Sequence, residues 1–167
     1  ETIDIQVGAL SSPWLPLPYP TSRISGLNGN WFWEPSGLSV SSPDHLASGQ
    51  DYQVSSLILK PTPAQLTAAG TIVPSGFTKY LDLPSDLPAI ITNTATAVVA
   101  GESTNYEKAV ALQEFFRNGD FDYSETAPVD QGFDGSGMAV IAKFLQVKSG
   151  YCIHFASAMA VMARTLG

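Results

Sequence analysis

The sequence has few of the residues on which disulfides and nucleic-acid surfaces depend. Its 167 residues include one cysteine, two histidines, and eight lysines and arginines in total, against 15 aspartates and glutamates. One cysteine excludes an internal disulfide framework. The net charge of −7, with no cluster of basic residues, excludes a surface that releases counterions from nucleic acid. We therefore expect no nucleic-acid partner, and the sequence predicts no metal site and no cofactor.

A membrane-spanning run and a targeting segment are also missing. The apolar stretch that follows Cys152 has about 14 residues, whereas a membrane helix needs about 20. The chain opens directly on a strand-like pattern rather than on a signal peptide. We expect either a cytoplasmic protein or an excised extracytoplasmic segment. Few charged residues, with many Ser, Thr, Pro and Gly, suit an exported bacterial domain, and a hydrophobic content of 44% is enough for a packed core.

The first 60 residues carry strand patterns. Polar and apolar residues alternate from Thr2 to Val7, and Asn28-Gly29 predicts a hairpin turn before an aromatic strand. The proline-rich segment 12–20 is expected to run extended over the surface, with Trp14 and Tyr19 packed onto the core. Strands are expected over residues 2–7, 31–33, 38–40 and 51–60.

The later residues carry helix patterns. A capping box, Thr104-x-x-Glu107, begins a helix that stops at Asn118-Gly119. A glycine-rich loop at 131–137 does not match a phosphate-binding fingerprint. The other expected helices are 64–69 closed by Gly70, one from Ser85 or Asp86 to Gly101 with Pro88 in its first turn, 138–146, and 152–166.

Strands followed by helices predict an α+β fold with two lobes. The first lobe, residues 1–75, is a small antiparallel β unit with a linker. The second, residues 76–167, is helical and ends in the helix of Cys152.

Cys152 follows the turn signal Ser149-Gly150 and begins a run of helix-forming residues. Unpaired N–H groups and the positive end of the helix dipole favour a thiolate there, so we predict that Cys152 is a nucleophile. The alternative is that Cys152 is a small core hydrophobe, which is the more common role of a lone cysteine. The helix behind it has almost no polar stripe, which predicts protein on most of its sides.

The segment Gly150-Tyr-Cys152-Ile-His-Phe-Ala-Ser-Ala-Met, continuing to Gly167, resembles the cysteine motif of bacterial transglutaminase-like proteins in the papain-like superfamily. Residues 108–117, 121–124 and 143–145 resemble the helices and turn before that cysteine. The resemblance covers about residues 80–167, and a weaker similarity to membrane-anchored actinobacterial members extends into the first half. It implies a β lobe followed by the helical half of a transglutaminase-like domain, on the extracytoplasmic side of a bacterial membrane.

The family resemblance also implies an activity and its limits. In that family a histidine and an aspartate follow the nucleophile in later strands, and no residue up to Gly167 matches them. The resemblance therefore implies a cysteine acyltransferase or protease that forms a thioester with a glutamine or peptide amide of a protein or peptide substrate. Residues 1–167 alone are expected to be inactive, because the histidine and the aspartate lie beyond Gly167.

Two other interpretations stay open from the sequence. In the first, the fold is a non-catalytic module that binds cell-envelope protein or glycan, and Cys152 is buried. In the second, a structural β domain carries an incidental helical tail, and residues 1–75 fold alone. If the strands that cover the Cys152 helix are missing, its apolar surface predicts a homo-oligomer. Membrane contact is expected only through segments absent here.

Three other polar residues are candidates for roles beside the thiol. His154 lies about 200° around the helix from Cys152, so its ring is expected to point away from the thiol. His45 sits in a loop far upstream, and neither histidine is expected to be the base. Gln146, six residues before Cys152, is either a donor to the oxyanion or a surface residue at the end of a helix.

Overall fold

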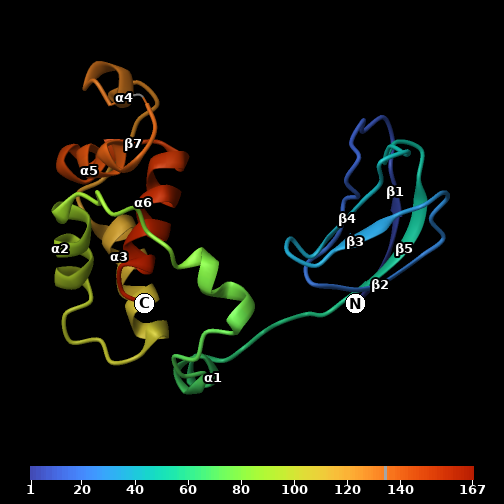
Figure 1. Ribbon diagram of the computed structural model, residues 1–167, viewed down its shortest axis with the longest axis horizontal. Helices are drawn as coiled ribbons and strands as arrows, with labels where there is room; N and C mark the ends of the chain where they lie inside the picture. The colour runs from blue at the N-terminus through green and yellow to red at the C-terminus, as the bar shows by residue number, and fades with distance from the viewer. Residues whose placement is uncertain (134) are drawn as a thin grey trace. The chain divides into compact units, whose positions relative to one another are not determined.

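A computed structural model describes residues 1–133 and 135–167 (Figure 1). The chain divides into two compact units, Glu1–Lys60 and Pro61–Gly167, and each has its own hydrophobic core. The first unit is built of strands and the second mostly of helices, which confirms the predicted α+β class. The linker segment 61–75 groups with the helical unit.

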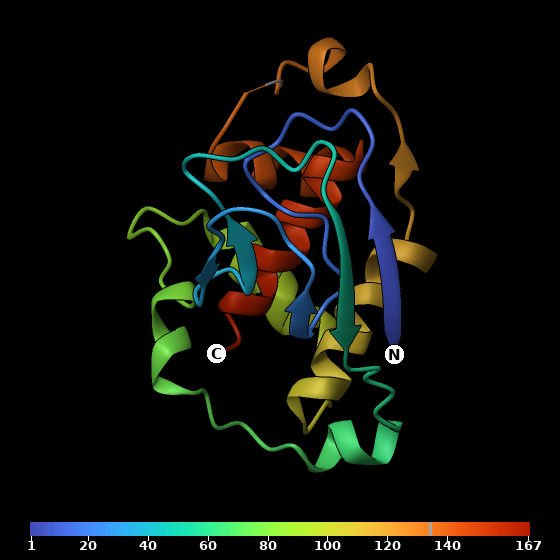
Figure 2. The ribbon, with the colours of Figure 1, turned by 90° about the vertical axis from the view of Figure 1, so that its right-hand side faces the viewer.

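The β unit contains a three-stranded and a two-stranded antiparallel sheet. The order of the larger sheet is β1-β5-β2, and Figure 2 shows β1 and β5 side by side in opposite directions. Opposed pairs such as Ile5 and Tyr52 place alternate side chains of β1 and β5 on the core face. The strands are β1 Thr2–Gln6, β2 Thr21–Ser25, β3 Phe32–Glu34, β4 Ser39–Ser41 and β5 Asp51–Ser56.

Two expectations for the β unit are wrong. Asn28-Gly29 does not close a hairpin, because β2 pairs with β5 and β3 pairs with β4. Trp14 and Tyr19 are 47% and 71% exposed rather than packed onto the core. Trp14 forms a bridge to Ser41 of β4, and alternation along this extended segment turns the neighbouring Leu15 inward instead.

Tyr52 of β5 joins the core to the proline-rich segment. Its ring is buried, and its hydroxyl donates a hydrogen bond to the carbonyl oxygen of Pro16 at 2.6 Å. Burial raises the pKa of the Tyr52 hydroxyl, because the core disfavours the phenolate. The hydrogen bond satisfies the hydroxyl inside the core, where an unpaired polar group is costly.

The second unit contains six α-helices, one 3₁₀ helix and two short strands among the described residues. The longer helices lie where the sequence predicts them, and β6 lies in the segment 121–124, which the sequence predicts to be extended; the sequence does not predict the 3₁₀ helix, α4 or β7. The elements are α1 Pro63–Ala68, the 3₁₀ helix η1 Ser75–Tyr80, α2 Ala89–Val98, α3 Asn105–Asn118, β6 Asp122–Tyr123, α4 Ala127–Asp130, α5 Met138–Val147, β7 Ser149–Gly150 and α6 Cys152–Arg164.

Helix starts follow the local chemistry of the chain. Thr104 caps α3 as predicted: its hydroxyl accepts the Glu107 N–H, and the Glu107 carboxylate accepts the Thr104 N–H at 2.9 Å. Helix α2 begins later than expected, because Pro88 is its N-cap rather than a residue of its first turn. A residue before proline avoids the helical region, so Leu87 cannot start the helix.

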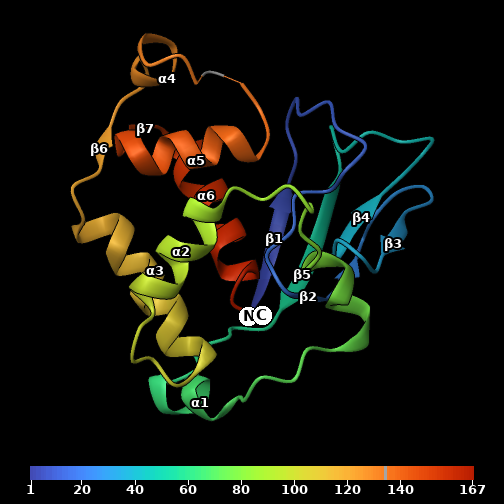
Figure 3. The ribbon, with the colours of Figure 1, turned by 60° about the vertical axis from the view of Figure 1, so that its left-hand side comes forward.

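Helix α6 is the centre of the helical unit, and α2, α3 and α5 pack against it (Figure 3). Its buried residues, His154, Ala158, Val161 and Met162, lie on one face. The expectation of protein on most sides is wrong for the residues described here, because Ile153 on another face is 60% exposed. No helix in the described parts of the chain is both long and apolar enough to span a membrane.

We expect Thr104→Ala to lower the free energy of unfolding by about 1 kcal/mol, because the Glu107 N–H loses its cap. Hydrogen bonds from the Thr104 hydroxyl and N–H, and then from the Ser103 N–H, lower the pKa of Glu107. A lowered carboxyl pKa stabilises the fold above the unfolded pKa, and this contribution is lost as the pH falls through the folded pKa.

Urea unfolding of the wild type, Thr104→Ala and Glu107→Gln between pH 7 and pH 3 measures both effects. The stability difference between wild type and Glu107→Gln should shrink as the pH falls below about 4.3. A difference that stays constant across this range would contradict the role of the Glu107 carboxylate.

Candidate active site at the start of helix α6

The turn before Cys152 is held by a short parallel pairing of β6 with β7. Lys148 is the C-cap of α5, and its φ of 56° turns the chain in the left-handed region. The Asp122 N–H donates to the Lys148 carbonyl oxygen at 2.9 Å, and the Ser124 N–H donates to the Gly150 carbonyl oxygen at 2.8 Å. The predicted turn Ser149-Gly150 is therefore a strand that delivers the chain to α6.

Gly150 is the buried residue of this turn, and its surroundings leave no room for a side chain. A Cβ added there would lie 3.0 Å from Phe144 Cδ2 and 3.1 Å from His154 Nδ1. Contacts that short are tighter than ordinary van der Waals packing. The glycine lets β7 lie directly on the two rings.

His154 supports the turn from inside. Its ring is 4% exposed, stacks on Phe144 at 5.7 Å between centroids, and meets Phe133 and Tyr151 edge-on. Its Nδ1 accepts the N–H of Tyr151, the residue that caps α6, at 3.3 Å. The imidazole therefore orients the helix start from within the core.

Cys152 is the first residue of α6, and its side chain is exposed. In the described part of the chain, the N–H groups of Cys152 and Ile153 make no backbone hydrogen bond. Free N–H groups at the start of a helix attract negative charge. An anion formed at the thiol would meet these donors.

An apolar groove of about 530 Å³ lies beside the thiol. Tyr123 of β6 forms one wall; it is 64% exposed, and its ring stacks on Phe155 of α6 at 6.3 Å between centroids. The groove is lined by Gln113, Phe116, Arg117, Tyr123, Cys152, Phe155, Ala156 and Met159. The groove therefore lies beside an exposed sulfur, and its surface can hold an apolar or aromatic group.

Comparison with protein families identifies both units. Residues 92–167 match the model of the transglutaminase-like superfamily, and residues 1–63 match that of the TgpA N-terminal domain. The first of these matches confirms the family resemblance on which the Cys152 prediction rests in part.

Solved structures show the same fold over the whole chain. Two crystal structures of the periplasmic domain of TgpA from Pseudomonas aeruginosa, one of them bound to ethylmercury, each match 98% of this chain with a TM-score of 0.64. The sequence identities are 20% for the ethylmercury complex and 21% for the other structure, and the matches cover 53% and 51% of those chains. This chain therefore spans about half the length of the solved domain. No curated protein matches the chain.

The other residues singled out in the sequence lie away from the groove of the transglutaminase-like domain. Gln146 is exposed near the end of α5 and does not line the groove, so its role in holding an oxyanion stays a prediction. His45 belongs to the β unit, where its ring lies against Gly29. Sequence reasoning missed Tyr123 and Phe155, although Tyr123 lies in the recognised segment 121–124.

The described residues contain no cluster of His, Cys, Asp and Glu side chains able to hold a metal ion. The glycine-rich loop predicted at 131–137 includes Asp134, which lies outside the described residues; the rest of this loop leads to α5.

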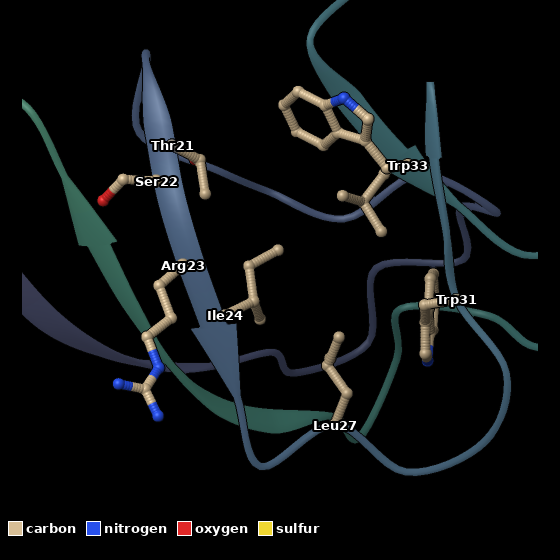
Figure 4. Close-up of a pocket in the computed structure, with 8 residues that line it drawn as sticks. Thr21, Ser22, Arg23, Ile24, Leu27, Trp31 and Trp33 are labelled. Atoms are coloured by element: carbon tan, nitrogen blue, oxygen red, sulfur yellow. The ribbon is translucent and has the colours of Figure 1, made fainter. Parts of the chain in front are cut away.

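The β unit has a pocket of about 360 Å³ between β2 and β3 (Figure 4). Ile24, Leu27, Trp31 and Trp33 surround this space, whereas Arg23 points away from it. The Ser22 hydroxyl donates to the Ser55 carbonyl oxygen at 3.0 Å. Binding sites usually combine apolar walls with polar groups that converge on the ligand. The Thr21 and Ser22 hydroxyl groups that line this pocket donate to backbone carbonyl oxygens, and we assign no function to the pocket.

We expect Gly150→Ala to lower the free energy of unfolding by about 1 to 3 kcal/mol, because the new methyl group must push apart β7 and two core rings. Gly76→Ala is the matched control: Gly76 has no atom within 4 Å of an added Cβ and no positive φ. Urea unfolding followed by circular dichroism measures both variants. Equal stabilities of the two variants would contradict the close packing at Gly150.

Proposed function

We propose that this chain carries the nucleophile of a cysteine acyltransferase or peptidase of the transglutaminase-like type. The observation that supports this proposal is an exposed thiol at the start of the central helix of a transglutaminase-like domain. The general base and the acid that orients it come from outside residues 1–167, in a longer protein. Residues 1–167 alone are then inactive, because a nucleophile without its base loses orders of magnitude in rate.

The reaction is acyl transfer through a thioester. The Cys152 sulfur attacks the carbonyl carbon of a glutamine or peptide amide, and the thiol proton passes to the base. The N–H groups of Cys152 and Ile153, which make no backbone hydrogen bond, donate to the oxyanion of the tetrahedral intermediate. The intermediate collapses, the base returns the proton to the leaving amine, and a thioester remains. An amine or water then attacks the thioester and releases the sulfur.

The groove beside Cys152 supports a protein or peptide substrate. Tyr123, Phe155 and Met159 give it an apolar surface next to the sulfur, and Arg117 lies on its border. An apolar side chain next to the reacting amide would bury surface there and hold the carbonyl near the thiol.

We further propose that the domain acts outside the cytoplasm. The solved domain with the same fold is a periplasmic domain, and the β unit matches the N-terminal domain model named after the same protein. Few charged residues and a net charge of −7 suit such a location.

The alternative is a non-catalytic module that binds cell-envelope protein or glycan. The sequence predicts this module with a buried Cys152. The structure contradicts that burial, because the Cys152 side chain is exposed. What remains of the alternative is an exposed thiol of ordinary reactivity. Thiol chemistry therefore separates the two functions.

Alkylation by iodoacetamide at pH 6 tests the nucleophile. Cys152 is the only cysteine, so mass spectrometry assigns all labelling to it. We expect it to react about tenfold or more faster than glutathione at the same pH, because the unpaired N–H groups at the start of α6 stabilise negative charge beside them. Urea-unfolded chain is the control, and its rate should fall to that of the free thiol. A folded rate equal to the unfolded rate would favour the non-catalytic module.

Activity requires the longer protein. We expect it to release ammonia or an amine from glutamine-containing peptides, and Cys152→Ala in that protein should abolish the release. Residues 1–167 should show none. Turnover by residues 1–167 that disappears in Cys152→Ala would overturn the proposal that the base lies elsewhere.

A further inference from the structure

The groove beside Cys152 contains side-chain charge of one sign only. Arg117 of α3 is the one arginine or lysine among its lining residues, and none of the described residues that line it is an aspartate or a glutamate. The whole chain has 15 acidic residues against eight basic ones, so a groove with a cation and no carboxylate departs from the composition of the protein. The acyl-transfer steps proposed above give this cation no role.

Helices α3 and α6 run in opposite directions beside the groove. Asn105, at the start of α3, lines a small cavity together with Ala163, near the end of α6. Toward the other end of α3, the rings of Phe116 and Phe155 lie with their centroids 6.1 Å apart. This antiparallel packing places the last turn of α3, which contains Arg117, beside the first turn of α6. The guanidinium and the thiol therefore belong to the same end of the groove.

Two acidic residues close to Arg117 in the sequence are engaged with other groups. Glu114, one turn earlier on α3, accepts a hydrogen bond from the side-chain amide of Asn118. Asp120 pairs with Lys148 at 3.3 Å, which is the one ion pair among the described residues. A guanidinium attracts anions, and its planar fork fits the two oxygens of a carboxylate. Arg117 can thus pair with a carboxylate of a molecule that occupies the groove.

The apolar part of the groove sets the rest of the ligand. Tyr123 and Phe155 stack beside the sulfur, and Met159 continues the apolar surface about one turn further along α6. An apolar side chain would be removed from water against these residues. Apolar contact alone does not fix the direction of a peptide in a groove, whereas an ion pair at one end of the groove does. A fixed direction holds the reacting carbonyl near the thiol.

We propose that Arg117 is a specificity-determining residue and that the substrate of Cys152 is an acidic peptide. An apolar side chain beside the reacting amide lies in the groove, and a nearby carboxylate of the same peptide pairs with Arg117. This inference rests on the function proposed above, because it names the substrate class of the same site.

Alkylation of residues 1–167 by bromoacetyl peptides tests this substrate class. Cys152 is the only cysteine, and its thiolate displaces bromide from the bromoacetyl carbon, so mass spectrometry gives one rate constant for each probe. Bromoacetyl-Phe-Glu-amide and bromoacetyl-Phe-Gln-amide differ in the charge of one side chain. Bromoacetyl-Phe and its amide differ in the charge of the chain end. Each acid-to-amide ratio of rate constants is divided by the same ratio for the urea-unfolded chain.

We expect a normalised ratio of about three at low salt for at least one pair, the size expected for an exposed ion pair. The pair that shows the preference tells whether the carboxylate belongs to a side chain or to a chain end. Bromoacetyl-Gly-Glu-amide lacks the ring and should react about threefold more slowly than the Phe-Glu probe, because it buries less apolar surface. Equal rates of these two probes would overturn the apolar part of the proposal.

Three variants assign the preference to Arg117. Arg117→Gln should return the ratio to that of the unfolded chain, because a neutral side chain forms no ion pair. Arg117→Lys should keep part of the preference, since the charge stays while the planar fork is lost. Arg164→Gln is the matched control: Arg164 also lies in the last turn of its helix, but it does not line the groove.

The absence of a preference in both pairs, or an equal loss of preference in Arg117→Gln and Arg164→Gln, would overturn the proposal. Both members of a pair react with the same sulfur, so their ratio does not depend on how reactive the thiol is. An activated thiol without a preference would therefore overturn this inference alone. A thiol of ordinary reactivity whose preference disappears in Arg117→Gln would contradict the proposed nucleophile and support the acidic ligand.

Discussion

The start of α6 depends on the contact of Gly150 with the rings of Phe144 and His154. Because Gly150 has no Cβ, β7 lies directly on the two rings, and His154 Nδ1 comes within reach of the Tyr151 N–H. The sulfur of the next residue is then exposed while the imidazole is buried. This contact explains why a histidine two residues from the thiol supports the helix start instead of serving as a base.

A cluster of aromatic rings holds this arrangement in place. Phe121 and Phe155 both contact Phe144, with ring centroids 5.3 and 5.0 Å apart, and Phe116 packs against all three. These rings come from α3, α5, α6 and the segment before β6. Edge-on and tilted pairs of this kind add to the stabilisation from burial alone. The turn with Cys152 thus rests on a rigid layer, as a site that must hold an atom in position requires.

The faces of α6 have different roles because of its period of 3.6 residues. The face with Ala158 and Met162 is buried against the other helices. The flank with Cys152 and Ala156 opens on the apolar groove, and the flank with Ser157 and Arg164 opens on a cavity of about 420 Å³ beside the start of α5. Small residues such as Ala156 and Ala160 keep both flanks open.

The sequence by itself determined the features that depend on neighbouring residues. The capping box at Thr104, the alternation in β1 and the helix that begins at Cys152 follow from local hydrogen bonds and hydrophobic period, and the structure has them all. Only the tertiary structure decided which strands pair, since β2 joins β5 across a long separation. It also decided that Tyr123 lies beside Cys152 and that the buried His154 ring lies against Gly150. Such contacts depend on how distant segments pack, and no local pattern encodes that packing.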